Sequence, residues 1–251
     1  MLRDKLPNFD EGWEPHFRWR GGDVSRIENL SDAVFGFALT LLVISSGVPR
    51  TWDQMVEALW QVPVFAACFA LFVWVWYCHY KFSRRYGLED VTTVVWNALL
   101  LFVVLVYVYP LKFLATFLMR LVRGLPPHRV EQPDGSVLDV FTGEGQIQTF
   151  MAVYSGGFAV LFALFALLHL HAWRRREFLA LNEVERFLTL SDLRAHGIST
   201  AIGLVSMLLA LSVDERGVFA GMLYFLMGPL HALNGRAQTR GLRRLGVAPG
   251  G

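Results

Sequence analysis

The sequence predicts an all-α, polytopic membrane protein with six transmembrane helices. Three observations predict this class: the composition, the number of long apolar stretches and the placement of basic residues. Hydrophobic residues make up 54% of the 251-residue chain and charged residues only 18%, a balance that is unusual for a soluble domain. A membrane-spanning helix needs about 20 mostly apolar residues. Six stretches meet this need, at residues 28–48, 55–80, 91–118, 148–173, 197–213 and 217–234.

Basic residues predict the orientation of these helices. If the N-terminus lies inside, most lysines and arginines fall on the inner segments, and the positive-inside rule places both termini in the cytoplasm. Residues 1–24 are too charged for a cleavable signal peptide, so we expect a cytoplasmic or interfacial segment there. Residues 25–236 form the predicted transmembrane domain, with an extracytoplasmic loop at about 124–146 and a cytoplasmic tail at 237–251.

The first predicted helix has a polar start and an apolar continuation. Residues 26–32 read RIENLSD, and the apolar run 33–44 follows directly. An ionisable side chain inside a span costs about 2.5 to 3.5 kcal/mol on insertion scales and usually finds a partner. Arg26 and Asp32 are six residues apart and do not share a helix face. We therefore expect their partners on other helices.

The second and third predicted helices bring further polar residues to the same depth. The second ends its apolar part with WYCH at residues 76–79, and the third begins on that side with Trp96 and Asn97. A network of interhelical hydrogen bonds would satisfy these groups, and a clamp that only holds the helices together is the alternative interpretation. The expected members of the network are Arg26, Ser31, Asp32, His79 and Asn97.

The later helices carry weaker signals. Gly156-Gly157 in the fourth helix and Gly228-Pro229 in the sixth are candidate breaks or packing sites. Residues 186–192 repeat the spacing of the first-helix motif as RFLTLSD. We interpret this repeat as chance, or as a helix-start cap formed by Ser191 or Asp192.

The start of the chain resembles a known family. Residues 26–35, RIENLSDAVF, are similar to the opening of the transmembrane protein 175 family, the endolysosomal potassium channels and their bacterial relatives, whose signature is Arg-x-x-x-Phe-Ser-Asp. Leu30 stands where the family has phenylalanine. Trp76-x-x-His79 and the run from Asn97 to Pro110 are similar to the family's second and third helices. The resemblance covers about residues 26 to 110.

This resemblance implies a potassium-permeable cation channel without enzymatic activity. Bacterial members are six-helix subunits that assemble as tetramers, and their first helices line a central pore with apolar side chains. Carried over to this chain, the narrow positions are Phe37, Leu41 and Ile44, with a hydroxyl from Thr40. The spacing i, i+4, i+7 independently puts the three apolar residues on one helical stripe. Packing of this stripe against a neighbouring helix is the competing interpretation.

The resemblance further implies a homotetramer in a bacterial plasma membrane, with monovalent cations as permeant species and no cofactor or metal. Phe37 is bulkier than the isoleucine or leucine that is usual in the family, which leaves the discrimination between potassium and sodium open. The excess of arginine over lysine is typical of a bacterium with a GC-rich genome. Walker, GxSxG and HExxH motifs are absent from the sequence, so neither an enzyme nor a nucleic-acid-binding protein is expected.

Two alternatives from other classes remain. A proton-coupled transporter would use Asp32 and His79 as a relay. A membrane electron carrier would hold b-type haem between histidines on different helices. The histidines near the inner side are His79, His169, His171, His196 and His231.

Overall fold

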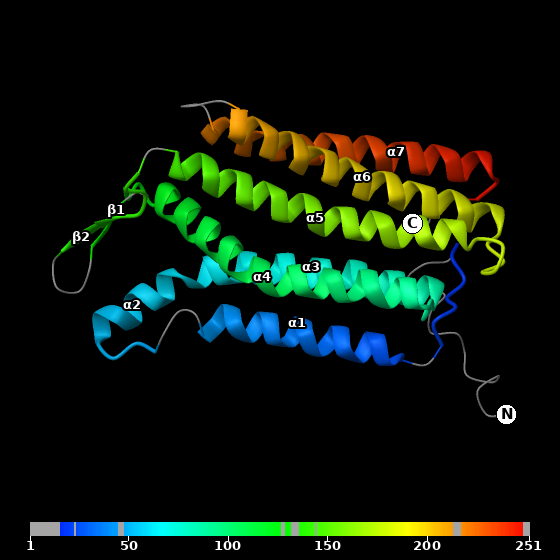
Figure 1. The fold of residues 1–251 in the computed structure, drawn as a ribbon, viewed down its shortest axis with the longest axis horizontal. Helices are drawn as coiled ribbons and strands as arrows, with labels where there is room; N and C mark the ends of the chain where they lie inside the picture. The colour runs from blue at the N-terminus through cyan, green and yellow to red at the C-terminus, as the bar shows by residue number, and fades with distance from the viewer. Residues whose placement is uncertain are drawn as a thin grey trace.

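The computed structural model describes residues 16–22, 24–44, 48–126, 129–131, 136–143, 145–212 and 217–247. Its long helices run lengthwise through one elongated bundle (Figure 1). In chain order the elements are α1 (Arg26–Ile44), α2 (Trp52–Trp60), α3 (Val62–Tyr86), α4 (Val91–Val122), β1 (Arg129–Glu131), β2 (Val137–Asp139), α5 (Gln146–Arg174), α6 (Glu183–Ser212), the 3-10 helix η2 (Gly217–Leu226) and α7 (Met227–Arg244). Within the described residues, five helices are long and apolar enough to cross a membrane: α1, α3, α4, α5 and α6. The predicted class of helical membrane protein is thereby confirmed.

The bundle has two sides. α1, α3 and α4 pack together along one side, and α5, α6 and α7 lie along the other (Figure 1). The contact between α4 and α5 joins them, and Gly157 permits it, because a Cβ at this position would come within 2.5 Å of the Tyr107 ring. α5 continues without a break through Gly156 and Gly157. This glycine pair is therefore a packing site.

The second predicted stretch, 55–80, is divided into α2 and α3 at Gln61. Pro63 lies in the first turn of α3, where a backbone N–H would have no partner within the helix, so proline is tolerated there. Its ring would clash with the preceding turn if α2 continued into α3 as one regular helix. α3 extends past the predicted end to Tyr86. It stops at Gly87, whose φ of 55° is in the left-handed region that ends many helices.

The fifth predicted stretch, 197–213, is too short, because α6 begins at Glu183. Asn182 and Glu185 cap this start: each side chain accepts a hydrogen bond from the other's backbone N–H, at 2.9 and 3.0 Å. Ser191 and Asp192 lie inside the helix. The prediction that one of them caps it is wrong.

The end of the chain and the long loop also differ from expectation. The sixth stretch, 217–234, consists of η2 and the first turns of α7, and the candidate break at Gly228-Pro229 lies beside their junction. α7 continues to Arg244, so residues 237–244 are helical. The loop at 124–146 contains an antiparallel hairpin in which Val130 pairs with Leu138. In the described part of the chain the fold is therefore helical with a short hairpin, which lies with α2 at one end of the bundle (Figure 1).

Candidate functional site

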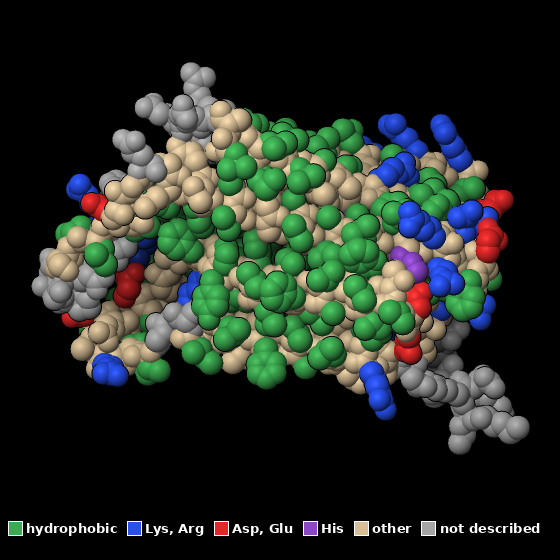
Figure 2. Space-filling view, in the orientation of Figure 1, with side chains coloured by type: hydrophobic (Ala, Val, Ile, Leu, Met, Phe, Trp, Pro, Cys, Tyr) green, Lys and Arg blue, Asp and Glu red, His purple; other side chains and the backbone are tan. Residues whose placement is uncertain are grey.

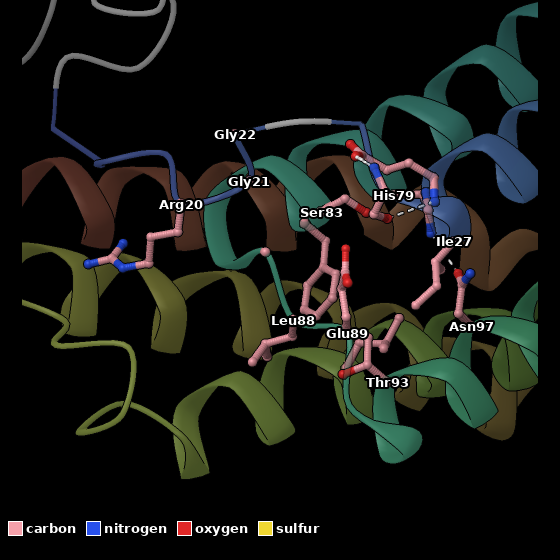
Figure 3. Close-up of a pocket in the computed structure, with 15 residues that line it drawn as sticks. Arg20, Gly21, Gly22, Ile27, His79, Ser83, Leu88, Glu89, Thr93 and Asn97 are labelled. Atoms are coloured by element: carbon pink, nitrogen blue, oxygen red, sulfur yellow. Dashed lines mark hydrogen bonds between the residues drawn. The ribbon is translucent and has the colours of Figure 1, made fainter. Parts of the chain in front are cut away.

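A buried polar cluster joins α1, α3 and α4. Asn97 lies at its centre: His79 Nε2 is 2.6 Å from Asn97 Oδ1, and Asn97 Nδ2 donates to Ser31 Oγ at 3.0 Å. Ser31 Oγ donates in turn to the carbonyl of Ile27 at 2.8 Å. Because an amide oxygen only accepts, His79 is the donor in the first bond. Figure 3 shows His79 and Asn97 turned toward each other. The cluster ties three helices together at one depth.

The other two residues expected in this network lie apart from it. Asp32 accepts a hydrogen bond from Trp76 Nε1 at 2.7 Å and makes no direct bond to His79. Arg26 is exposed, and within the described residues it has no ion pair or side-chain hydrogen bond. The indole N–H of Trp76 is thus the donor to Asp32, a partner that the sequence did not predict. Its position three residues before His79 was the available signal.

A cavity of about 220 Å³ lies beside the cluster. Ile27, His79 and Asn97 line one part of it, and Glu89 and Thr93 line another (Figure 3). A cavity of this volume has room for water molecules next to the polar side chains that line it. The start of α1 therefore borders a partly polar cavity on the side that faces the protein.

α1 has one covered and one open face. The covered face consists of Glu28, Ser31, Phe35, Ala38 and Leu42, which recur every three or four residues. On the open face, Phe37 and Ile44 are both 68% exposed, and Thr40 is exposed with its hydroxyl donating to the Gly36 carbonyl at 2.9 Å. Leu41 lies at the edge, partly buried against the core. The structure thus places three of the four expected pore residues on one uncovered stripe.

The segment 17–21 crosses the end of the bundle, and the sequence did not predict its contacts with α3 and α6. Arg20 and Gly21 donate through their backbone N–H groups to the carbonyl of Arg84 in α3, both at 3.0 Å. The guanidinium of Arg20 reaches the other side, where Nη1 and Nη2 bind the Glu185 carboxylate at 3.0 and 2.7 Å. In Figure 3 the Arg20 side chain points away from the cavity. This segment connects α1 to the start of α6.

The segment 17–21 also covers a second interhelical contact. Phe17 is 5% exposed, packs edge-on against Tyr86 at 5.6 Å, and lies under the Arg85 guanidinium at 4.5 Å. Arg85 forms an ion pair with Asp192 of α6. Tyr86 shares a hydrogen bond of 2.8 Å with the hydroxyl of Thr189. The repeat of the first-helix motif on α6 therefore contributes one ion pair with α3.

The remaining histidines make separate contacts. His169 Nδ1 lies 2.9 Å from the carbonyl of Phe165, and its ring is 4.8 Å from that of His196. His231 Nε2 lies 3.0 Å from Ser199 Oγ. In the described part of the chain, no three histidine, cysteine or acidic residues are grouped for a metal ion.

His171 contacts Asp90, the N-cap residue of α4. Its Nε2 lies 2.7 Å from Asp90 Oδ2, and Arg175 lies 3.4 Å from the same oxygen. Asp90 also accepts hydrogen bonds from the backbone and hydroxyl of Thr93 at 2.9 and 2.8 Å. Burial alone would raise the pKa of Asp90, but these hydrogen bonds outweigh it and hold the pKa below its usual value. Asp90 is thereby a stable anionic cap between α3 and α4.

Comparison with known proteins agrees with this arrangement. The family model described as "Endosomal/lysosomal potassium channel TMEM175" matches residues 26–108. A protein of Marivirga tractuosa named "Potassium channel" is 38% identical over 239 residues, which cover 93% of this chain and 95% of that protein. A crystal structure of a variant of the potassium channel MtTMEM175, in complex with a nanobody fusion protein, is 35% identical with a TM-score of 0.77. It covers 90% of this chain and 98% of its own.

A second crystal structure shows likeness of fold alone. It is described as a lysosomal potassium-selective channel TMEM175 homologue from Chamaesiphon minutus, and is 21% identical with a TM-score of 0.51 over 83% of this chain and 96% of its own. The resemblance that the polar start of α1 indicated is confirmed by the Marivirga relative over nearly the whole chain. The chain belongs to the TMEM175 family of endosomal and lysosomal potassium channels and their relatives.

Proposed function

We propose that the chain forms a potassium-permeable channel in which α1 from each of four subunits lines a central pore. The observation that carries this proposal is the open stripe on α1, where Phe37 and Ile44 are 68% exposed while the opposite face is buried. Ser31, anchored by His79 and Asn97, sets the rotation of α1 about its axis. A pore-lining helix needs both an uncovered face and a fixed rotation.

The stripe supports a constriction made of side chains. Phe37 and Ile44 are seven residues apart, so the two rings they would form are separated by about 10 Å along the axis. Thr40 lies between them, and because its hydroxyl proton goes to the Gly36 carbonyl, the oxygen lone pairs are left for a cation. Apolar rings of this kind gate by excluding water, and a wider ring lowers the barrier.

The proposed channel domain comprises residues 25–236 with six spans. η2 rises about 20 Å over its 10 residues, and the first eight residues of α7 add about 12 Å. Together they match the hydrocarbon core of about 30 Å. The basic residues gather at the end of the molecule opposite α2 and the hairpin (Figure 2), which favours a cytoplasmic location for both termini in a bacterial plasma membrane. The channel needs no cofactor, and potassium is the permeant ion.

The test is cation flux into proteoliposomes with Phe37→Ala and Leu41→Ala. We expect Phe37→Ala to raise potassium flux several-fold and to reduce the preference for potassium over sodium, because it removes the bulkiest side chain of the stripe and widens the constriction. Leu41→Ala should have the smaller effect, since Leu41 is partly buried. Val43→Ala is the matched control: Val43 is 54% exposed on the same helix but turned about 120° from Phe37. Unchanged flux in both test variants, with assembly intact, would show that this stripe does not line the pore.

A further inference from the structure

α7 carries an arginine face that the proposed channel activity does not use. Arg236, Arg240, Arg243 and Arg244 follow the spacing i, i+4, i+7, i+8, which puts all four on one side of the helix. All four are exposed, and within the described residues none has an ion-pair partner. Residues 227–245 contain no acidic side chain. The face is therefore a concentrated positive charge with nothing in its own helix to neutralise it.

Packing of the opposite side of α7 fixes where this face points. Gly241 lies against the ring of Phe187 in α6, where a Cβ would collide with it. Asn234 Nδ2 donates to the carbonyl of Ser191 at 3.2 Å. These contacts hold α7 antiparallel to α6, so the arginines face away from the bundle. Figure 2 shows lysine and arginine side chains gathered at this end of the surface.

The position of the face matches the headgroup layer of a membrane. Asn234 lies level with Ser191, next to the Arg85–Asp192 ion pair at the basic end of the bundle. From Arg236 to Arg244 the helix rises about 12 Å, so the arginines span the polar layer of one leaflet, which is about 5 to 8 Å thick, and continue to its aqueous side. Leu233 is 57% exposed and lies seven residues before Arg240, on the same side of α7. An apolar surface thus continues directly into a basic one.

We propose that this arginine face binds anionic phospholipid of the cytoplasmic leaflet, with acyl chains along the exposed apolar surface and the phosphate held by guanidinium groups. Arginine is suited to this ligand because its planar fork makes two parallel hydrogen bonds to phosphate. Clusters of four or more basic residues at the cytoplasmic end of a span attract anionic lipid by about 1 kcal/mol per charge. A soluble phosphate compound would use the charge but not the apolar continuation.

The experiment titrates purified, detergent-solubilised protein with phosphatidylglycerol or phosphatidylcholine and counts bound lipids by native mass spectrometry. We expect tighter binding of phosphatidylglycerol, weakened about 25-fold in the double variant Arg240→Gln with Arg243→Gln, at about fivefold per charge. Arg240→Lys should retain most of the affinity. Arg50→Gln is the matched control, since Arg50 is an exposed arginine outside this face with no ion pair among the described residues.

Three results would overturn the proposal. They are equal affinity for the two lipids, unchanged phosphatidylglycerol affinity in the double variant, and binding of glycerol phosphate as tight as binding of the lipid. The last result would mean a site for soluble anions. Because arginines on an exposed face contribute little to folding, the size-exclusion profile of each variant should match that of the parent chain. The double variant Arg236→Gln with Arg240→Gln repeats the test with a second pair of arginines.

Discussion

Replacing Glu185 by glutamine removes the negative charge that holds the segment 17–21 on the bundle. The carboxylate accepts four hydrogen bonds: from Arg20 Nη1 and Nη2, from the backbone N–H of Arg18 at 2.9 Å, and from the backbone N–H of Asn182 at 3.0 Å. Its side chain is 1% exposed, and that of Arg20 is 15% exposed. Glutamine would retain one acceptor oxygen but turn an NH2 group toward one pair of donors. The substitution therefore leaves a nearly buried guanidinium without its counter-charge.

The expected cost follows from this burial. Breaking a buried ion pair by removing one partner costs about 3 to 5 kcal/mol. Arg20 keeps hydrogen bonds to the carbonyls of Leu179 and Arg18, at 2.7 and 2.9 Å, which favours the lower end of that range. A loss of about 3 kcal/mol corresponds to a decrease in Tm of roughly 6 to 12 °C for a chain of this size.

Thermal unfolding in detergent, followed by intrinsic fluorescence, measures this decrease. Glu177→Gln is the matched control, because Glu177 pairs with Arg186 near the same helix start but is 73% exposed. An exposed pair contributes at most about 1 kcal/mol, so the control should shift Tm by a few degrees at most. Equal shifts in the two variants would refute the view that the Arg20–Glu185 pair anchors the segment before α1.

Two further predictions concern Asn97 and Asp90, near the start of α4. Asn97→Leu should lower the free energy of unfolding by about 1 to 3 kcal/mol, because it leaves the Nε2–H of His79 without its acceptor; denaturant titration in mixed micelles measures this, and the exposed Asn29→Leu should change little. Asp90 has a depressed pKa in the folded protein. Its stabilising contribution is therefore present above the unfolded pKa of about 3.9 and is lost as pH falls through the lower folded value. The Tm difference between the parent chain and Asp90→Asn should shrink as pH decreases from 6 to 3, and a constant difference would exclude this linkage.

Much of the fold could be predicted because each residue contributes its own free energy to the insertion of a helix into a bilayer. The apolar stretches set the long helices, and their polar starts put Ser31, His79 and Asn97 at one depth. Helix ends were less predictable. Pro63 indicates the division between α2 and α3, but it lies within the long apolar stretch 55–80. Asn182 and Glu185 indicate the start of α6, but they lie in a polar segment well before the apolar stretch 197–213.

Contacts between distant segments could not be predicted. Arg20 and Glu185 are 165 residues apart, and either could have paired with many other charges near the same membrane surface. Asp32 was at the predicted depth but bonds Trp76, because hydrogen-bond choice depends on rotation about the helix axis as well as on depth. Such choices depend on which neighbouring side chains fill the space.

Local composition and short motifs are enough to predict the membrane class, the depth of the polar residues and the family. Which face of α1 is covered becomes visible only when the helices are packed together. Phe37 and Ile44 are open and Leu41 is partly buried, although all three share one stripe in the sequence pattern. The physical reason is that the hydrogen bonds around Asn97 and the packing of α3 and α4 set the rotation of α1, and rotation is a property of the assembled helices.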